Sequence, residues 1–202
     1  MQVLDFLLDL IFPRFCVGCG KLGKYFCDDC RKEIKFYLPT KRNKKFFALA
    51  HYDGIIRQAI HNIKYRGHFA IIKEIAPLFP KPPFIFDYLI PVPLSSQRLH
   101  DREFNQSLVL AQELGKKWQV PVLNYLKRTR DTKPQFNLPE KARFKNVHNA
   151  FVLISNFKFQ ISNSSVCLVD DVSTTGATLN ECAKVLRQAG VKKVCAVCIA
   201  KG

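Results

Sequence analysis

The stretch VCLVDDVSTTGATLNE at residues 166–181 constrains the fold most, because it joins an apolar strand, two carboxylates, a hydroxyl-rich loop and a helix without interruption. A loop that leads into a helix presents free backbone N–H groups and the positive end of the helix, which favour a bound phosphate. Gly176 permits a ligand to approach the backbone closely. Thr178 and Glu181 match the T-x-x-E capping box, which predicts that this threonine caps the helix. The stretch therefore predicts an anion site at the carboxyl end of a strand.

Asp170 and Asp171 stand beside this phosphate-binding loop, where two carboxylates would oppose an anion unless they bind something else. Sugar hydroxyls, or a divalent cation held through water, would satisfy them. A phosphorylated sugar fits both halves of the site. The stretch has neither the G-K-[ST] of a P-loop nor the G-x-G-x-x-G of a dinucleotide turn. The structural alternative is an ordinary strand–turn–helix with a good cap.

Strand and helix patterns alternate along most of the chain, which predicts an α/β fold with a mainly parallel sheet flanked by helices. Expected strands are residues 48–52, 85–93, 120–128, 166–170 and 191–200, and expected helices are 1–12, 55–65, 69–79, 104–118 and 179–190. Residues 128–149 are polar and basic without a clear period, which favours a lid or a binding loop.

Two C-x-x-C knuckles lie in the first part of the chain. Tetrahedral zinc takes four thiolates, and the ion would supply folding free energy that so small a segment lacks. We therefore expect Cys16, Cys19, Cys27 and Cys30 to hold a structural Zn²⁺. An iron–sulfur cluster is the rival, and unconnected thiol pairs or a redox C-x-x-C are the alternatives without metal. The predicted units are an N-terminal helix with this zinc module at 1–40 and the α/β domain at 41–202.

The other four cysteines, Cys167, Cys182, Cys195 and Cys198, are expected to pack in the core. Cys195 and Cys198 also spell C-x-x-C, but residues three apart in a strand point to opposite faces of the sheet. They are therefore not expected to share an ion.

The chain carries 32 Lys and Arg against 16 Asp and Glu, a formal net charge of +16 at pH 7. Such an excess attracts polyanions, nucleic acid first. Several cations alternate with aromatic residues, a pattern that suits phosphate attraction and base stacking of single strands. The expected DNA-binding residues are Lys41, Arg42, Lys44, Lys45, Lys64, Arg66, Arg128, Arg130, Arg143 and Lys145. The alternative is a solvated face whose aromatic rings turn into the core.

No segment approaches the ~18 apolar residues needed to cross a bilayer. The apolar start MQVLDFLLDLIF contains Asp5 and Asp9 and lacks the basic start and the cleavage site of a signal peptide. We expect an amphipathic helix there that packs on the main domain, with contact to a membrane surface as a minor alternative. Without an export signal, a reducing cytoplasmic location is expected, with the eight cysteines as thiols or metal ligands and not as disulfides.

Several motifs point to a known family. LVDDVSTTGAT resembles the 5-phosphoribosyl 1-diphosphate (PRPP) signature of type I phosphoribosyltransferases. The tandem knuckles, YDGIIRQAIHNIKYRG, LIPVPLSSQRLHDREFNQS, RTRDTKPQFNL and this loop follow one another in the order seen in the ComF family of competence proteins, over nearly the whole chain. Glu103 departs from the glycine that usually precedes Phe-Asn-Gln in that family, which bears on the backbone shape of its loop.

The resemblance implies a role for each part of the site. Asp170 and Asp171 would hold the ribose hydroxyls and act in any catalysis. The 5-phosphate would lie against Ser173, Thr174, Thr175, Gly176, Ala177 and Thr178, and the diphosphate with its Mg²⁺ against Leu94, Ser95, Arg98 and Arg102 of the loop at 91–96 and the residues after it. Residues 128–137 would match the flexible loop that closes over the reaction centre.

The resemblance also implies a function. The protein would be cytoplasmic, or peripheral to the inner membrane, and would handle incoming single-stranded DNA in natural transformation with competence proteins such as a DNA-translocating helicase. The alternative is an enzyme that transfers phosphoribosyl to a nitrogen nucleophile and releases pyrophosphate. The sequence leaves this choice open, because it shows no clear base-reading hood after the last expected strand.

Overall fold

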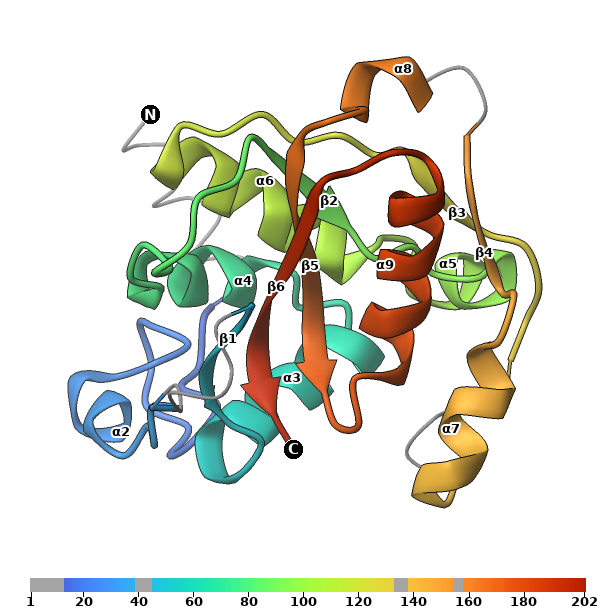
Figure 1. Cartoon of the computed structure of the whole chain (residues 1–202). Coiled ribbons are helices and arrows are strands. Elements are labelled where there is room, and N and C mark those ends of the chain that lie inside the picture. The colour runs from blue at the N-terminus through green and yellow to red at the C-terminus, as the bar shows by residue number, and fades with distance from the viewer. Residues whose placement is uncertain (1–12, 39–44, 133–137, 155–157) are drawn as a thin grey trace.

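A computed structural model describes residues 13–38, 45–132, 138–154 and 158–202 (Figure 1). The expected helix at 1–12 and the basic residues Lys41, Arg42 and Lys44 lie outside these ranges. Four strands form a parallel sheet in the order β1-β6-β5-β2. Their bounds are β1 Phe46–His51, β2 Tyr88–Pro91, β5 Ser165–Ser173 and β6 Lys193–Lys201. The predicted parallel α/β sheet is confirmed.

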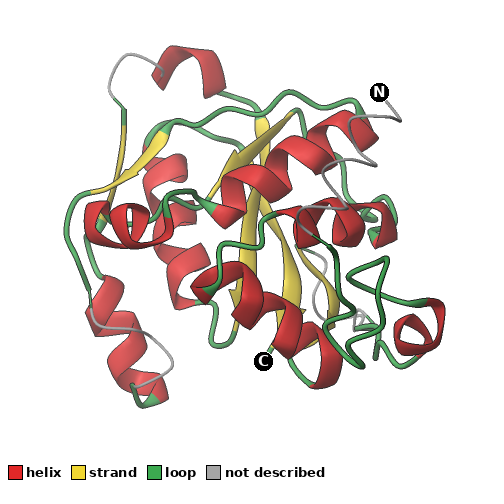
Figure 2. Cartoon of the chain, turned by 180° about the vertical axis from the view of Figure 1, so that it is seen from behind, coloured by secondary structure: helices red, strands yellow, loops and turns green. Residues whose placement is uncertain are grey.

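Helices cover both faces of this sheet (Figures 1 and 2). One face carries α3 Gly54–Tyr65, α4 Ala70–Ile75 with the 3₁₀ turn η1 Ala76–Leu78, and α6 Gln106–Trp118, and the other carries α9 Ala177–Gln188. Successive side chains of β5 alternate between the two cores: Cys167 and Val169 pack with α3 and α6, whereas Val166 and Leu168 pack with α9. Burial on both sides explains why residues 166–169 of this strand are all apolar.

The core cysteines follow the same alternation. On β6, Cys195 packs in the core with α3 and α6, and Cys198 packs in the core with α9. Cys167 and Cys182 are also fully buried. The prediction that these four thiols pack in the core, with the two on β6 facing opposite sides, is confirmed.

A two-stranded antiparallel ribbon, β3 Leu126–Arg128 with β4 Phe151–Leu153, lies beside α9. The expected strand at 120–128 is wrong in length and in place, because only its last part is a strand and that part joins this ribbon. Val122 reaches the central sheet only through an isolated bridge to Leu89. The chain therefore contacts the sheet briefly after α6 and then leaves it before β3 begins.

Part of the predicted binding loop at 128–149 is the helix α7 Glu140–Val147. The carbonyl oxygen of Pro139 accepts hydrogen bonds from the N–H groups of Ala142 and Arg143, at 3.0 and 3.2 Å. Val147 is the one buried residue of this fully described helix. An apolar stripe is the signal by which periodicity reveals a helix, and α7 has none.

Three short helices complete the described secondary structure: α2 Asp28–Lys32, α5 Ser96–Arg102 and α8 Lys158–Ile161. Among the described helices, none has both the length and the apolar character needed to cross a membrane.

The cysteine-rich segment packs directly on the α/β domain. Phe26 and Cys30 belong to the same buried core as α3 and α4. The carboxylate of Glu74 on α4 accepts hydrogen bonds from the backbone N–H groups of Tyr25, at 3.2 Å, and Phe26, at 3.1 Å. The predicted boundary near residue 40 stays a prediction, since residues 39–44 lie outside the described ranges.

Candidate functional site

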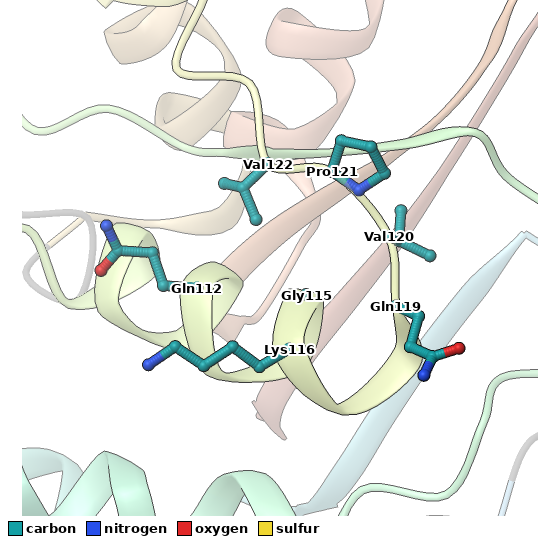
Figure 3. Close-up of a pocket in the computed structure, with 7 residues that line it drawn as sticks. All are labelled: Gln112, Gly115, Lys116, Gln119, Val120, Pro121 and Val122. Carbon is teal, nitrogen blue, oxygen red and sulfur yellow. The ribbon is translucent and has the colours of Figure 1, made fainter.

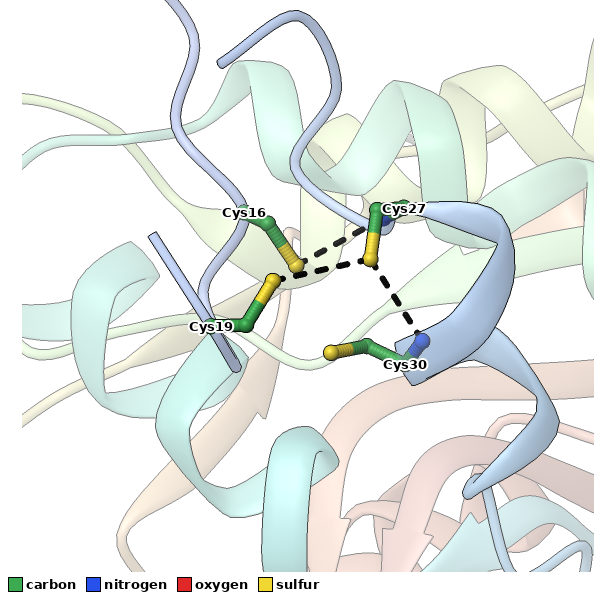
Figure 4. A group of neighbouring side chains, drawn as sticks. All are labelled: Cys16, Cys19, Cys27 and Cys30. Atoms are coloured by element: carbon green, nitrogen blue, oxygen red, sulfur yellow. Dashed lines mark hydrogen bonds between the residues drawn. The ribbon is translucent and has the colours of Figure 1, made fainter. Parts of the chain in front are cut away.

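The four N-terminal cysteines converge on one point (Figure 4). Cys27 is the N-cap of α2 and Cys30 lies within that helix, while Cys16 and Cys19 flank the preceding turn. Their Sγ atoms all lie within 4.8 Å of one another. Four sulfurs at ~2.3 Å from a zinc ion would be roughly 3.8 Å apart. The arrangement fits a tetrahedral ion such as Zn²⁺ held by all four thiolates.

Hydrogen bonds set the ionisation of this cluster. The N–H group of Cys27 donates to Cys16 Sγ at 3.5 Å. Burial opposes ionisation of Cys16, but bonds from the N–H groups of Cys27, Cys19 and Gly18 outweigh it and lower the pKa of its thiol to about 6. Bonds to the sulfurs of Cys27 and Cys19, with burial, raise the pKa of Cys30. Without a cation the cluster therefore keeps some of its protons, which metal binding would release.

The loop expected to bind phosphate lies between β5 and α9, at the carboxyl edge of the sheet (Figure 1). β5 runs as far as Ser173, so the loop consists of Thr174, Thr175 and Gly176. No described acceptor takes a hydrogen bond from the backbone N–H groups of these loop residues. Lys201, at the end of β6, donates to the Thr174 carbonyl oxygen and places a cation beside the loop. Free donors, a cation and the positive end of α9 make this loop suitable for an anion.

The predicted capping box at Thr178 and Glu181 is wrong. Gly176 is the N-cap of α9, with φ 77° in the left-handed region, and it has no side chain to cap the helix. The N–H group of Ala177 donates to Thr175 Oγ1 at 3.4 Å. The tight turn at this glycine starts the helix at Ala177, so Thr178 already lies in its first turn. The Glu181 carboxylate instead accepts a hydrogen bond from the N–H group of Asn149 at 2.9 Å. Its partner is thus a distant segment, not the start of its own helix.

Asp170 and Asp171 are held by α6 and α3, which lie on the face of the sheet opposite α9. Ser107 Oγ donates to Asp170 Oδ1 at 3.1 Å, and Gln106 Nε2 donates to Asp171 Oδ2 at 2.8 Å. Lys64 Nζ, near the end of α3, forms an ion pair with the same Asp171 oxygen at 3.0 Å. Neighbouring residues of a strand face opposite sides. The first turn of α6 contacts both carboxylates because it begins at the edge where β5 ends.

Burial, reinforced by the charge of Asp171, raises the pKa of Asp170 to about 7. The backbone N–H group of Asp171, at 2.9 Å, and the cation of Lys64 oppose this rise. A carboxyl group that titrates near neutral pH is suited to general acid–base chemistry. Asp170 is therefore equipped to take up or release a proton, which an ordinary aspartate is not.

Sequence reasoning missed Gln106 and Ser107 as partners of the acid pair, and it assigned Lys64 to the DNA-binding surface. Gln106 and Ser107 are 4% and 1% exposed. Their only sequence signal was their position in the segment LIPVPLSSQRLHDREFNQS. The side chain of Lys64 is 20% exposed, and nothing in the spacing of its neighbours shows that it turns inward.

The loop expected to bind diphosphate, residues 91–96, follows β2 and leads into α5 at the same edge of the sheet. Ser95 is 1% exposed, and its Oγ has no hydrogen-bond partner among the described residues. Leu94 is half-buried, as are the two arginines of α5, Arg98 and Arg102. The structure thus brings the predicted diphosphate residues to the edge that carries Asp170.

Glu103 ends α5 in the left-handed conformation, with φ 63° and ψ −12°. Its N–H group donates to the Leu99 carbonyl oxygen at 2.8 Å. This backbone region favours glycine. The glycine usual at this position therefore has a conformational reason, and the chain keeps a turn of that shape with a bulkier residue.

The residues expected to bind DNA fall into two groups. Exposed or half-buried are Lys45, Arg66, Arg130, Arg143 and Lys145. Arg128 is 6% exposed, and its guanidinium lies 5.3 Å from the centroid of the Phe151 ring. Arg128 and the inward-turned Lys64 are covered in this conformation. Among the described residues, the set expected to bind DNA is therefore reduced to the first group.

A surface depression of about 600 Å³ lies at the C-terminal end of α6 (Figure 3). It is lined by Gln112, Gly115, Lys116, Gln119, Val120, Pro121 and Val122. A Cβ on Gly115 would lie 2.7 Å from Val122 Cγ2, so glycine allows the following segment to pack on the helix. The depression is at the opposite end of α6 from Gln106 and is separate from the acid pair.

The chain is similar to a known domain family and to several known bacterial proteins. The phosphoribosyl transferase domain family matches residues 105–202, which include α6, β5 and the loop before α9. Competence protein F of Haemophilus influenzae is 34% identical over 202 residues, covering 89% of this chain and 86% of that protein. The DNA utilization protein YhgH of Escherichia coli K12 is 34% identical over 199 residues, covering 92% of this chain and 83% of that protein.

Among solved structures, the glutamine PRPP amidotransferase of B. subtilis aligns with a TM-score of 0.42 and 19% identity, over 67% of this chain and 26% of that chain. The similarity to Competence protein F is of a different order, since it covers most of both chains. The family indicated by the order of the sequence motifs is confirmed, and this chain belongs to the ComF family of competence proteins.

Proposed function

We propose that this protein handles incoming single-stranded DNA during natural transformation and binds PRPP at the loop between β5 and α9. Membership of the ComF family supports the first part, because the names of the relatives refer to competence and to DNA utilization. The second part rests on one observation: a loop with free backbone N–H groups lies beside two carboxylates at one edge of the sheet.

Each part of PRPP has complementary groups at this edge. The 5-phosphate suits the N–H groups and hydroxyls of Ser173, Thr174, Thr175, Gly176, Ala177 and Thr178, the ribose hydroxyls suit Asp170 and Asp171, and the diphosphate suits Leu94, Ser95, Arg98 and Arg102. Mg²⁺ would accompany the diphosphate and offset part of its charge. A Zn²⁺ ion at the four cysteines would act structurally, since all four of its positions would be filled by protein.

The DNA-binding part of the proposal rests on exposed cations next to exposed rings. Arg66 adjoins Tyr65, which is 58% exposed, and Lys145 adjoins Phe144, which is 44% exposed. A depression of about 570 Å³ lies between the cysteine module and α3, lined by Val17, Gly54, Arg57, Gln58, His61, Asn62 and Arg66. Cations attract the phosphates of a strand, and rings stack on its bases.

We place this activity in the cytoplasm, or at the inner face of the membrane where single strands enter, beside competence proteins such as a DNA-translocating helicase. Four cysteines buried in the core and four gathered as possible metal ligands suit a reducing compartment. Association with the membrane or with a helicase can be tested by fractionation and by co-purification from competent cells.

The DNA-binding part is tested with a fluorescent single strand at several salt concentrations. We expect Arg66→Gln and Lys145→Gln each to weaken binding and to reduce the slope of log affinity against log salt by about 1. Lys192→Gln is the matched control, because Lys192 is exposed and directly precedes β6, at the opposite edge of the sheet from the loop. Absence of strand binding at low salt would refute this part.

The PRPP part is tested by calorimetry with PRPP and Mg²⁺. We expect saturable binding that Gly176→Val abolishes, because a branched side chain in the left-handed conformation distorts the loop. The control is Gly67→Val, since Gly67 also has a positive φ, of 67°, but precedes α4 instead of lining the loop. Equal PRPP affinity in both variants would count against the proposed site.

The pKa of Asp170, about 7, favours a second candidate function, phosphoribosyl transfer to a nitrogen nucleophile. In that reaction the nitrogen lone pair forms a bond to the anomeric carbon of PRPP. The bond from this carbon to the diphosphate oxygen breaks, and pyrophosphate leaves with the electron pair. Asp170 would accept the proton that the nitrogen loses.

Release of pyrophosphate tests this second function. We expect release that depends on an added amine or base and that Asp170→Ala abolishes. Asp101→Ala is the control, since Asp101 is an exposed residue of α5 that accepts from Gln97 at 2.8 Å. If PRPP binds but no pyrophosphate is released with a broad panel of nucleophiles, the transfer function is refuted and only the binding function remains.

A further inference from the structure

One carboxylate of the α/β domain holds the backbone of the cysteine module. Glu74 lies on α4, and each of its two oxygens accepts one backbone N–H bond, from Tyr25 at 3.2 Å and from Phe26 at 3.1 Å. These two residues directly precede Cys27, the N-cap of α2 and the first residue of the second knuckle. All four cysteines come from one segment, but the path of the chain into the second knuckle is held from another element.

The hydrogen bonds continue from these residues into the cluster of sulfurs. The N–H group of Cys27, next along the chain, donates to Cys16 Sγ at 3.5 Å. Three successive N–H groups, those of residues 25–27, therefore each have a defined acceptor, and the third acceptor is a sulfur of the first knuckle. A change in the backbone at residues 25 and 26 would move both this N–H group and the Sγ atom of Cys27.

The helix that carries Glu74 is fixed in the core. Ile71, Ile72 and Ile75 of α4 are 0% exposed and belong to the same core as Phe26. Close packing of this kind holds a helix in one position. Phe26 is itself 4% exposed, so a backbone N–H group that lost its acceptor there would have little access to water. The carboxylate is thus a fixed acceptor for donors that need one.

We propose that Glu74 is a positioning residue of the metal site, which holds the N–H groups of Tyr25 and Phe26 so that the second knuckle meets the first. The inference rests on the zinc ion proposed at the four cysteines, and it makes the affinity for that ion depend on the α/β domain. Residues that orient metal ligands without touching the metal typically change its affinity about 10-fold to 100-fold when they are replaced.

The test measures the affinity of the full chain for Co²⁺, whose visible absorption reports binding by four thiolates, and for Zn²⁺ by competition. Glu74→Gln keeps the size of the side chain but leaves one oxygen for two N–H donors. We expect both affinities to fall about 10-fold to 100-fold. Glu113→Gln is the matched control and should leave them unchanged, because the side chain of Glu113 is also 23% exposed but pairs with Lys116 on α6.

Unfolding in urea separates positioning from a merely structural role. A merely structural carboxylate would stabilise the metal-free and the zinc-loaded protein equally. A ion that binds only the folded state adds stability according to its affinity, so a positioning carboxylate raises the gain from Zn²⁺. We therefore expect this gain to be smaller in Glu74→Gln than in the wild type. Equal losses with and without Zn²⁺, at unchanged Co²⁺ affinity, would overturn the inference.

Two further variants keep the inference testable if Glu74→Gln fails to fold. Glu74→Asp keeps both oxygens on a shorter side chain, and we expect metal affinity to fall because the carboxylate no longer reaches both N–H groups. Arg14→Gln removes an ion pair with Glu74, at 3.7 Å, but leaves the backbone bonds in place. Its affinity should fall less than that of Glu74→Asp, and the reverse order would contradict the role of the backbone bonds.

The outcomes distinguish this inference from the proposed metal site. A wild-type chain that binds neither Co²⁺ nor Zn²⁺ would refute the metal site itself. A wild-type chain that binds both, with unchanged affinity in folded Glu74→Gln, would overturn only the role of Glu74.

Discussion

The cysteine module and the loop at Asp170 are both candidate ligand sites that the sequence indicates, but they are built in different ways. Each ligand of the module comes from one short segment, and four Sγ atoms meet within 4.8 Å. The acid pair at the loop depends instead on Lys64, Gln106 and Ser107, which the fold brings from other elements. A site closed within one segment can be recognised from spacing alone, whereas a site at a sheet edge needs the whole domain to complete it.

The largest expected effect tests whether the module depends on its metal. Cys19→Ser removes one thiolate from the exposed side of the cluster, and we expect bound zinc to fall from one ion per chain to a small fraction. The stability lost should be several kcal/mol, below the roughly 10–16 kcal/mol that zinc supplies to isolated zinc fingers. Metal analysis and urea unfolding measure both.

Cys195→Ala is the control for this change, because Cys195 is a core thiol outside the cluster. It should keep its zinc and lose only packing energy. Equal metal content in Cys19→Ser and wild type would contradict the four-thiolate site, and bound iron with its absorption would identify the rival cluster.

The second effect tests how far the acid pair depends on a distant element. Lys64→Met leaves the buried carboxylate of Asp171 without its cation, and we expect a loss of about 3 kcal/mol in the free energy of unfolding. Lys35→Gln breaks the exposed pair with Asp53, whose side chains are 74% and 45% exposed, and should cost less than about 1 kcal/mol.

Asp171→Asn combined with Lys64→Met should recover much of this loss, since the charge of residue 171 is then removed together with its cation. A loss in Lys64→Met as small as that in Lys35→Gln would show that Gln106 alone satisfies the carboxylate. In that case the acid pair would depend less on α3 than we infer from the ion pair with Lys64.

The third effect uses pH. The pKa of Asp170 is raised from 3.8 to about 7 in the folded protein, so the native state holds this proton more tightly than the unfolded chain does. Its contribution is fully present at low pH and is lost as pH rises towards and through 7. Relative to Asp170→Asn, the wild type should lose about 2–3 kcal/mol between pH 5 and pH 8.

Urea unfolding at several pH values measures this difference. Asp29→Asn is the control, because Asp29 is an exposed residue of α2 in the module and should run parallel to the wild type. A flat difference between wild type and Asp170→Asn would mean that the carboxyl group is solvated like a surface aspartate.

The smallest effect concerns a local backbone shape beside the loop. Glu103→Gly should stabilise the protein by up to about 1 kcal/mol, because glycine adopts φ 63° without steric cost. Glu103→Ala should bring no such gain, since alanine carries the same Cβ. Thermal unfolding of both variants and the wild type measures these differences. A gain in Glu103→Gly would show that the backbone is strained at residue 103, whereas a loss in both variants would show that the glutamate side chain makes a stabilising contact.

Much of both sites was predictable because it follows from the covalent chain. The spacing of Cys16, Cys19, Cys27 and Cys30 fixes how their sulfurs can meet. The two-residue period of a strand placed Cys195 and Cys198 in different cores. The strand–loop–helix order of residues 166–181 predicted a loop at the carboxyl edge of a parallel sheet, and the structure has one between β5 and α9.

Local rules failed where a competing contact had the larger effect. The T-x-x-E pattern predicted a cap at Thr178, but the turn at Gly176 starts α9 earlier and Glu181 is engaged by Asn149. The helix α7 escaped prediction because it buries only Val147 and so has no apolar stripe. Neither the start of α9 nor the presence of α7 can be predicted from the spacing of the residues concerned.

The direction in which each cation points was decided by the tertiary structure alone. In the sequence, Lys64 and Arg128 look like Arg66 and Lys145, as basic residues in or beside polar segments. The fold turns Lys64 onto Asp171 with 20% of its side chain exposed, buries Arg128 at 6% exposed, and leaves the other two exposed. The physical reason is that chain geometry within a segment follows from bonds and period, whereas burial and the choice of partner depend on which elements the sheet brings together.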